Sequence, residues 1–166
     1  MTSKVETPRM ATVAEAQEIA ELLDRFNREF DTPSPGPTVL TARLERLLSG
    51  HQVVALLAGD PAVAVALLTL RPNVWCEGSV ALLDELYVVP AQRGRGVGAA
   101  LLKSAEAVVR ERGGELLEIN VDGEDSDARR FYERQGWSTN GVERPDPALS
   151  FLATPPLEVC YTLTLR

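Results

Sequence analysis

The sequence predicts an α/β fold in which about four helices flank a mixed, mostly antiparallel central sheet of about six to seven strands. Two β-rich runs, 52–58 and 62–70, are separated only by Gly-Asp-Pro, which suits an antiparallel hairpin. The segment 79–121 then reads as strand, glycine-rich loop, helix and strand, a βαβ unit with two parallel strands. The last run, 158–165, alternates apolar and polar side chains as a half-buried strand does.

Length and composition predict one soluble domain over residues 1–166. Hydrophobic residues make up 45% and charged residues 25% of the chain, and no shift in composition marks a second domain. No apolar run approaches the roughly 20 residues of a membrane-spanning helix. The first residues lack the apolar core of a signal peptide, so we expect a cytoplasmic protein.

The formal net charge of −7 disfavours partners that require a cationic surface. Nucleic acid and anionic membranes both require such a surface, so neither is an expected partner. The acidic balance instead favours a small cationic substrate.

The first third of the chain predicts a short strand and two helices. The strand is expected at residues 5–10. The segment 13–30 predicts a helix, because its apolar residues recur at the spacing of one helical face: Ile19, Leu22, Leu23 and Phe26. Three prolines within 31–37 end this helix, since proline lacks a backbone donor and fixes φ. A second helix is expected at 39–48, closed by Gly50.

The βαβ unit consists of a strand at 79–89, a helix at 99–112 and a strand at 116–121, with a glycine-rich loop after the first strand. The loop, Arg93-Gly-Arg-Gly-Val-Gly-Ala99, has glycines at alternating positions, which let a ligand approach the backbone. The helix that follows directs its free N–H groups and the positive end of its dipole at the loop. The loop therefore predicts a phosphate ligand.

Two other phosphate-binding motifs share part of this pattern. Gly94-x-Gly96-x-x-Ala99 formally satisfies a dinucleotide-binding fingerprint. However, the residues from Pro90 to Arg93 separate the strand from the first glycine, and there is only one βαβ unit. The sequence does not match a Walker-type loop, because Leu102 stands where that motif has a glycine before its lysine.

Two segments, in the expected order, resemble the signatures of the GNAT-type N-acetyltransferases. Arg93-x-x-Gly96-x-Gly98, preceded by Leu86–Pro90, resembles the family's acetyl-CoA pyrophosphate-binding signature. The run 128–137 resembles its second signature, Ala-x-x-Phe-Tyr-Glu-x-x-Gly-aromatic. The resemblance implies the GNAT fold, with the central parallel pair splayed apart to admit CoA. It also implies transfer of the acetyl group of acetyl-CoA to a primary amine of a small acceptor, in a ternary complex and without a metal.

Two other function classes stay open beside this one. A non-catalytic acyl-CoA-binding sensor would keep the loop but would not need Tyr132 or Glu85. A nicotinamide-dependent oxidoreductase would bind NADH instead of acetyl-CoA.

The resemblance assigns cofactor binding to two segments. Backbone N–H groups of the loop would bind the diphosphate, with Arg93 or Arg95 adding charge-assisted hydrogen bonds. Backbone groups of Leu86 and Val88 would pair with the pantetheine arm, and an N–H there could polarise the thioester carbonyl. The expected cofactor-binding residues are Leu86, Tyr87, Val88, Arg93, Gly94, Arg95, Gly96, Val97, Gly98 and Ala99.

Tyr132 and Glu85 are the expected catalytic residues. By resemblance, Tyr132 is the general acid that protonates the departing thiolate, whereas the helical pattern alone favours an aromatic residue packed beside Phe131. An amine with a pKa of about 10 must lose a proton before it attacks. Glu85, on the cofactor-binding strand, is the expected base. Asp84 is its competitor and is expected on the opposite face of the strand, and water alone could also serve.

The segment after the βαβ unit predicts a short helix and a long loop. Either Asp125 or Ser126 can cap a helix that ends at Gly136. Asp125 stands where the family often has asparagine. An aspartate cannot donate the hydrogen bond that an asparagine amide could give to the cofactor. Most of 138–157 is expected to be a loop. Separately, exposed strand edges near the C-terminus could support a homodimer.

Several other reactive residue types are expected to be structural. His51 is predicted to lie in a surface loop, and Trp75 and Cys76 in a turn where they pack rather than react. The number and spacing of the two cysteines, Cys76 and Cys160, suggest neither a disulfide framework nor a metal site. By resemblance, the link between the first two helices would line the acceptor site, where the acidic residues Glu29 and Asp31 would suit a cation.

Overall fold

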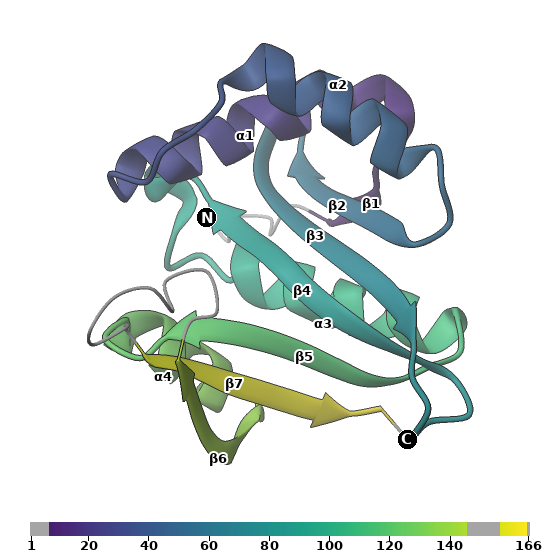
Figure 1. Cartoon of the computed structure of the whole chain (residues 1–166). Helices are drawn as coiled ribbons and strands as arrows, with labels where there is room; N and C mark the ends of the chain where they lie inside the picture. Colours follow the sequence, from purple (N-terminus) through teal and green to yellow (C-terminus); the bar gives the residue numbers. More distant parts are fainter. Residues whose placement is uncertain (1–6, 146–156, 166) are drawn as a thin grey trace.

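The computed structural model describes residues 7–145 and 157–165. Within these ranges, a sheet of seven strands lies between two layers of helices (Figure 1). Among the described residues, no helix has the length and hydrophobicity that crossing a membrane requires. The elements in chain order are β1 (Arg9–Met10), η1 (Val13–Glu15), α1 (Ala16–Glu29), α2 (Pro37–Leu48), β2 (Val53–Gly59), β3 (Ala62–Pro72), β4 (Ser79–Val88), η2 (Pro90–Gln92), α3 (Val97–Glu111), β5 (Gly114–Asp122), α4 (Ser126–Arg134), β6 (Ser138–Pro145) and β7 (Leu157–Thr164).

The sheet is mixed, as the sequence predicted, and its strands follow the order β1-β2-β3-β4-β5-β7-β6. The strands from β1 to β4 form an antiparallel meander, and β5, β7 and β6 also pair antiparallel. Among the described strands, β4 and β5 are the parallel pair, joined through α3. The predicted βαβ unit is therefore confirmed at the centre of the sheet, and its glycine loop follows the end of β4.

The helices bury opposite faces of the sheet in two separate clusters of side chains, and Figure 1 shows α1 and α2 together on one side. The cluster under α1 and α2 includes Ile19, Leu44, Leu57, Val65 and Tyr87. The cluster under α3 and α4 includes Leu83, Leu101, Val109, Tyr132 and Tyr161. Because successive strand residues alternate between faces, neighbouring side chains of β4 reach different helix layers.

The parallel pair separates along its length, as the resemblance implied. Its register runs from Ser79 opposite Gly114 to Leu82 opposite Glu118. Beyond Leu82, the described part of β4 has no pairing with β5, which instead continues alongside β7 to Asp122. Figure 1 shows the two strands diverging toward the glycine-loop end of β4. The pairing of the sheet is thus interrupted between β4 and β5, where the resemblance implies that the ligand arm enters.

A β-bulge interrupts β4 at Asp84. Leu67 of β3 pairs with Glu85, whereas the next residue, Leu68, pairs with Leu83, so Asp84 is an extra residue. Thr69, on the α1 side of β3, donates a hydrogen bond of 2.6 Å to Asp84 Oδ2. Asp84 and Glu85 therefore lie on the same face, and the expectation that they lie on opposite faces is wrong, because the bulge breaks the strict alternation.

Two further differences concern the ends of the sheet. β6 occupies Ser138–Pro145, at the start of the segment expected to be mostly loop. Its residues lack the apolar alternation of a strand, and it forms by pairing with β7. The first strand is shorter than expected, at Arg9–Met10, and the expected residues 5 and 6 lie outside the described part of the chain.

Candidate active site

The glycine loop enters α3 through two residues with left-handed backbone. Gly94 has φ +70° and Gly96, the N-cap of α3, has φ +81°, which L-residues with a Cβ rarely adopt. No side chain caps α3, and no acidic residue lies in its first turn. The first N–H groups of the helix therefore donate no hydrogen bond to a capping side chain, and the positive end of the helix dipole favours an anion there. The loop has the form of a phosphate cradle.

Gly98 brings the loop close to the rest of the site. A Cβ built at this position would lie 3.5 Å from the Phe131 ring and 3.6 Å from the Val88 side chain. The start of α3 thus packs between the end of β4 and α4, which unites the two sequence signatures in one place.

The two arginines of the loop differ in their surroundings. The Arg93 guanidinium forms an ion pair with Glu29 of α1, with Nη1 and Oε1 2.6 Å apart, and its Nε donates a hydrogen bond of 2.9 Å to the Val88 carbonyl. Arg95 is exposed and makes no ion pair with any described residue. Of the two, Arg95 therefore has the guanidinium that is free for a ligand. The ion pair of Arg93 was not foreseen from the sequence.

The side chains of Leu86, Tyr87 and Val88 point away from the sheet plane. Leu86 and Val88 pack against the cluster under α3 and α4, whereas Tyr87 is buried in the cluster under α1 and α2. Any contact of these residues with a ligand in the opening between the strands would come from their backbone groups.

Glu85 is a half-buried carboxyl in the part of β4 that pairs with β3 but not with β5. Burial, followed by the charge of Asp84, raises its pKa to about 7. Burial also raises the pKa of Asp84, while the hydrogen bond from Thr69 acts in the opposite direction. Since Glu85 titrates near neutral pH, it can both accept and release a proton there.

Tyr132 belongs to α4, whose N-cap Asp125 accepts a hydrogen bond of 2.9 Å from the Ala128 N–H. This confirms Asp125 as the capping residue. The Tyr132 side chain is buried, and its ring packs beside Phe131, Trp137 and Tyr161. Burial, then the charges of Asp125 and Glu85, raise the pKa of its hydroxyl. The phenol is therefore protonated at neutral pH, as a proton donor must be, and it lies within the electrostatic reach of Glu85.

Other residue types considered from the sequence lie apart from this site. His51 is exposed, as expected, and Cys76 is a half-buried free thiol. Trp75 is 90% exposed, so the expectation that it packs is wrong. No group of metal-ligating side chains occurs among the described residues, which exclude the side chain of Cys160.

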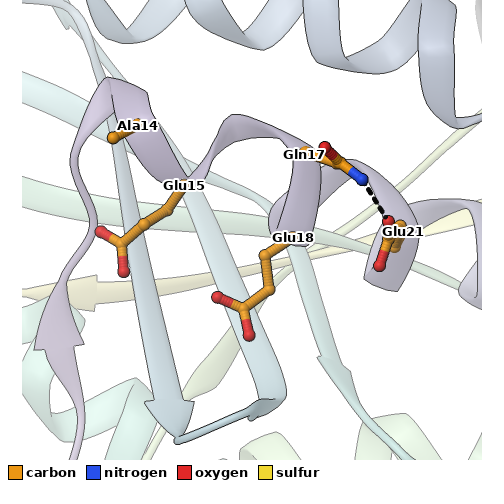
Figure 2. A pocket seen from close by; sticks show the side chains of 5 residues that line it. All are labelled: Ala14, Glu15, Gln17, Glu18 and Glu21. Carbon is orange, nitrogen blue, oxygen red and sulfur yellow. Dashed lines mark hydrogen bonds between the residues drawn. The ribbon is translucent and has the colours of Figure 1, made fainter.

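A surface hollow on α1 is also distinct from the site (Figure 2). Its lining residues are Ala14, Glu15, Gln17, Glu18 and Glu21. They come from η1 and the first half of α1, whereas the glycine loop contacts Glu29 at the other end of that helix. Glu18 accepts a hydrogen bond from the Ala62 N–H, so part of this acidic surface has a structural role.

A parallel pair that separates beside a phosphate cradle is the arrangement that the resemblance implies for an acetyl-CoA-dependent acyltransferase. The chain belongs to the Acetyltransferase (GNAT) family, whose model matches residues 16–137. Both sequence signatures lie inside this match.

Individual relatives agree with the family. A protein of known structure from Arthrobacter sp. FB24 is 54% identical in sequence to this chain. The match spans 86% of this chain and 94% of the Arthrobacter protein, and its TM-score is 0.78. The uncharacterized N-acetyltransferase YhfO of Bacillus subtilis is 28% identical over 131 residues, which are 78% of this chain and 87% of YhfO. The structure of yncA from Salmonella typhimurium with its cofactor acetyl-CoA shares the fold, with 18% identity and a TM-score of 0.71. The match spans 97% of this chain and 94% of yncA.

Proposed function

We propose that this N-acetyltransferase moves the acetyl group of acetyl-CoA to a primary amine of a small cationic acceptor, directly and within a ternary complex. The observation that carries the proposal is Glu85, a carboxyl with its pKa raised to about 7 beside the open part of the sheet. A base of this pKa suits removal of a proton from an ammonium group near neutral pH.

The residues of the glycine loop fit a diphosphate. The uncapped N–H groups at the start of α3 would bind it, from Gly94 to Ala99, and the exposed Arg95 would add a charge-assisted hydrogen bond. Backbone groups of Leu86 and Val88 would bind the pantetheine arm along the unpaired edge of β4. When bound there, acetyl-CoA supplies an activated thioester.

Glu85 and Tyr132 would divide the proton transfers between them. Glu85 takes a proton from the acceptor ammonium, which leaves a neutral amine to form the C–N bond. Tyr132 gives a proton to the sulfur as the C–S bond breaks, and its raised pKa keeps that proton available. The acceptor nitrogen loses two protons on the way from ammonium to amide: Glu85 would take the first before the C–N bond forms, and the second, lost as the tetrahedral adduct collapses, would restore the Tyr132 phenolate. The C–S bond breaks to give the CoA thiol, and Glu85 returns its proton to solvent.

Carboxylates on the face of β4 toward α1 support a cationic acceptor. Asp84 and Glu85 both lie on that face, because of the bulge. Glu29, which had also been expected to suit a cation, already pairs with Arg93 and accepts a hydrogen bond of 3.0 Å from the Tyr87 hydroxyl. Asp84 and Glu85 are therefore the groups proposed to attract the amine.

A panel of amines tests the proposal by release of free thiol from acetyl-CoA. At least one cationic amine is expected to stimulate release, and the Tyr132→Phe variant is expected to lower kcat by about 10²-fold, with KM for acetyl-CoA little changed. The substitution keeps the buried ring, so Tm should stay close to that of the unmodified protein. Full turnover of Tyr132→Phe would contradict the assigned acid. Binding of acetyl-CoA without stimulation by any amine would favour a sensor.

A further inference from the structure

The last residue of α1 contacts the first residue of the glycine loop. Two guanidinium nitrogens of Arg93 reach the Glu29 carboxylate: Nη1 lies 2.6 Å from Oε1, and Nη2 donates a hydrogen bond of 2.9 Å to Oε2. This is the two-point geometry in which an arginine and a carboxylate bind most strongly. Although both side chains are partly exposed, at 42% for Arg93 and 27% for Glu29, a two-point pair in a network is stronger than an isolated surface pair.

Tyr87 and the end of β4 extend this contact into a network. The Tyr87 hydroxyl donates a hydrogen bond of 3.0 Å to Glu29 Oε2, and the Arg93 guanidinium lies 5.6 Å from the centre of the Tyr87 ring. The Nε of Arg93 donates to the carbonyl of Val88, the last residue of β4. Arg93 is thus held by α1 and β4 at once. The hydrogen bond from Arg93 lowers the pKa of Glu29, so the carboxylate stays ionised.

The same end of α1 also holds the proline-containing link to α2. Asn27 Nδ2 donates a hydrogen bond of 2.9 Å to the Pro33 carbonyl, and Ser34 Oγ donates one of 2.6 Å to Asp24 Oδ1. The end of α1 is therefore fixed on one side by this link and on the other by the loop. A rigid support of this kind can hold Arg93 in one position.

We propose that Glu29 is a positioning residue of the acetyl-CoA site. It fixes Arg93, which fixes the start of the glycine loop against the end of β4 and so prearranges the N–H groups that follow. Prearranged donors bind more tightly, because less conformational freedom is lost on binding. The inference rests on the proposed function, since it concerns the same diphosphate site.

The test measures the Kd of CoA by calorimetry. Glu29→Gln keeps the size of the side chain and removes its charge, and we expect the Kd to rise about five-fold. Glu45→Gln, the same change on the exposed surface of α2, should leave the Kd unchanged. Tyr87→Phe removes one hydrogen bond to Glu29 and should act in the same direction to a smaller extent. Equal Kd values for Glu29→Gln and Glu45→Gln would overturn the proposal.

A double-mutant cycle separates positioning from a general structural effect. If Glu29 acts through Arg93, Glu29→Gln has no further effect on the Kd in an Arg93→Gln background. Additive losses would mean that the two residues act independently and would refute the positioning role. If the unmodified protein fails to bind CoA at all, the proposed function itself is wrong, an outcome distinct from binding that is insensitive to Glu29.

Discussion

The placement of two carboxyls, Asp84 and Glu85, depends on one residue inserted into β4. Without the bulge at Asp84, strict alternation would place Asp84 and Glu85 on opposite faces of the sheet. With it, two carboxyls share a face, and the charge of Asp84 adds to burial in raising the pKa of Glu85. The bulge thus adds the charge of Asp84 to burial, which is the larger cause of the raised pKa of Glu85.

This raised pKa predicts a cost in stability that depends on pH. Below the ordinary pKa of about 4.3, Glu85 is protonated in both the folded and the unfolded chain, and it costs nothing. As pH rises toward the folded pKa of about 7, the unfolded chain loses its proton first, so stability falls. Above that pH, Glu85 is ionised in both states, and the free energy of unfolding is lowered by the full amount that the pKa difference implies.

Glu85→Gln should therefore stabilise the protein at alkaline pH. The expected gain is about 1–3 kcal/mol near pH 8, discounted because the side chain is only half-buried, and less near pH 5.5. Urea unfolding at both pH values measures it, with Glu45→Gln as the control for removing one exposed charge. A gain that is equal at the two pH values would contradict a raised pKa for Glu85.

At the scale of elements, α3 depends on the residue at its N-cap. Gly96 has a left-handed backbone, so adding a Cβ there strains the turn, whereas Gly98 lies inside the helix with its nearest contacts at 3.5 Å and beyond. The two glycines look equivalent in the sequence, and only their backbone angles distinguish them. They therefore offer a matched pair of substitutions.

Gly96→Ala is expected to lower the free energy of unfolding by about 1–2 kcal/mol. Gly98→Ala should change it by less than about 0.5 kcal/mol, because alanine favours helix and fits the space. Chemical denaturation of both variants provides the measurement. Equal losses in the two would show that the left-handed turn at Gly96 is not what the loop requires.

The sequence predicts those elements that local patterns specify. The apolar spacing in α1 and the strand, loop and helix order of the βαβ unit are both local, and both appear in the structure. β6 has no such pattern, since it exists only through its pairing with β7. The ion pair of Arg93 with Glu29 joins residues far apart in the chain, so no local sequence motif predicts it. Glu85 and Tyr132 could be proposed from the sequence, because they lie in or beside the two signatures.

At the scale of the whole molecule, the candidate site lies where several layers meet. The opening between β4 and β5 separates the meander from the β5, β7 and β6 group, and the loop packs against α4 through Gly98 and against α1 through Arg93. A ligand in that opening would contact both halves of the sheet. Binding should therefore stabilise the fold as a unit.

Acetyl-CoA is accordingly expected to raise Tm, by mass action on the folded state. At about 100 times its Kd the added stability is about 2.7 kcal/mol, and NADH at the same concentration should have no effect. Thermal unfolding with each ligand makes the comparison. A Tm raised by NADH but not by acetyl-CoA would instead support nicotinamide binding.

The pH dependence of amine acetylation tests the central claim most directly, namely that Glu85 is the base. With the best amine of the panel, kcat/KM of the unmodified protein should rise with pH to a bend near pH 7, where Glu85 loses its proton. In Glu85→Gln that bend should disappear, leaving only the dependence that belongs to the amine. A bend near pH 7 that persists in Glu85→Gln would contradict the account, because another group would then be the base.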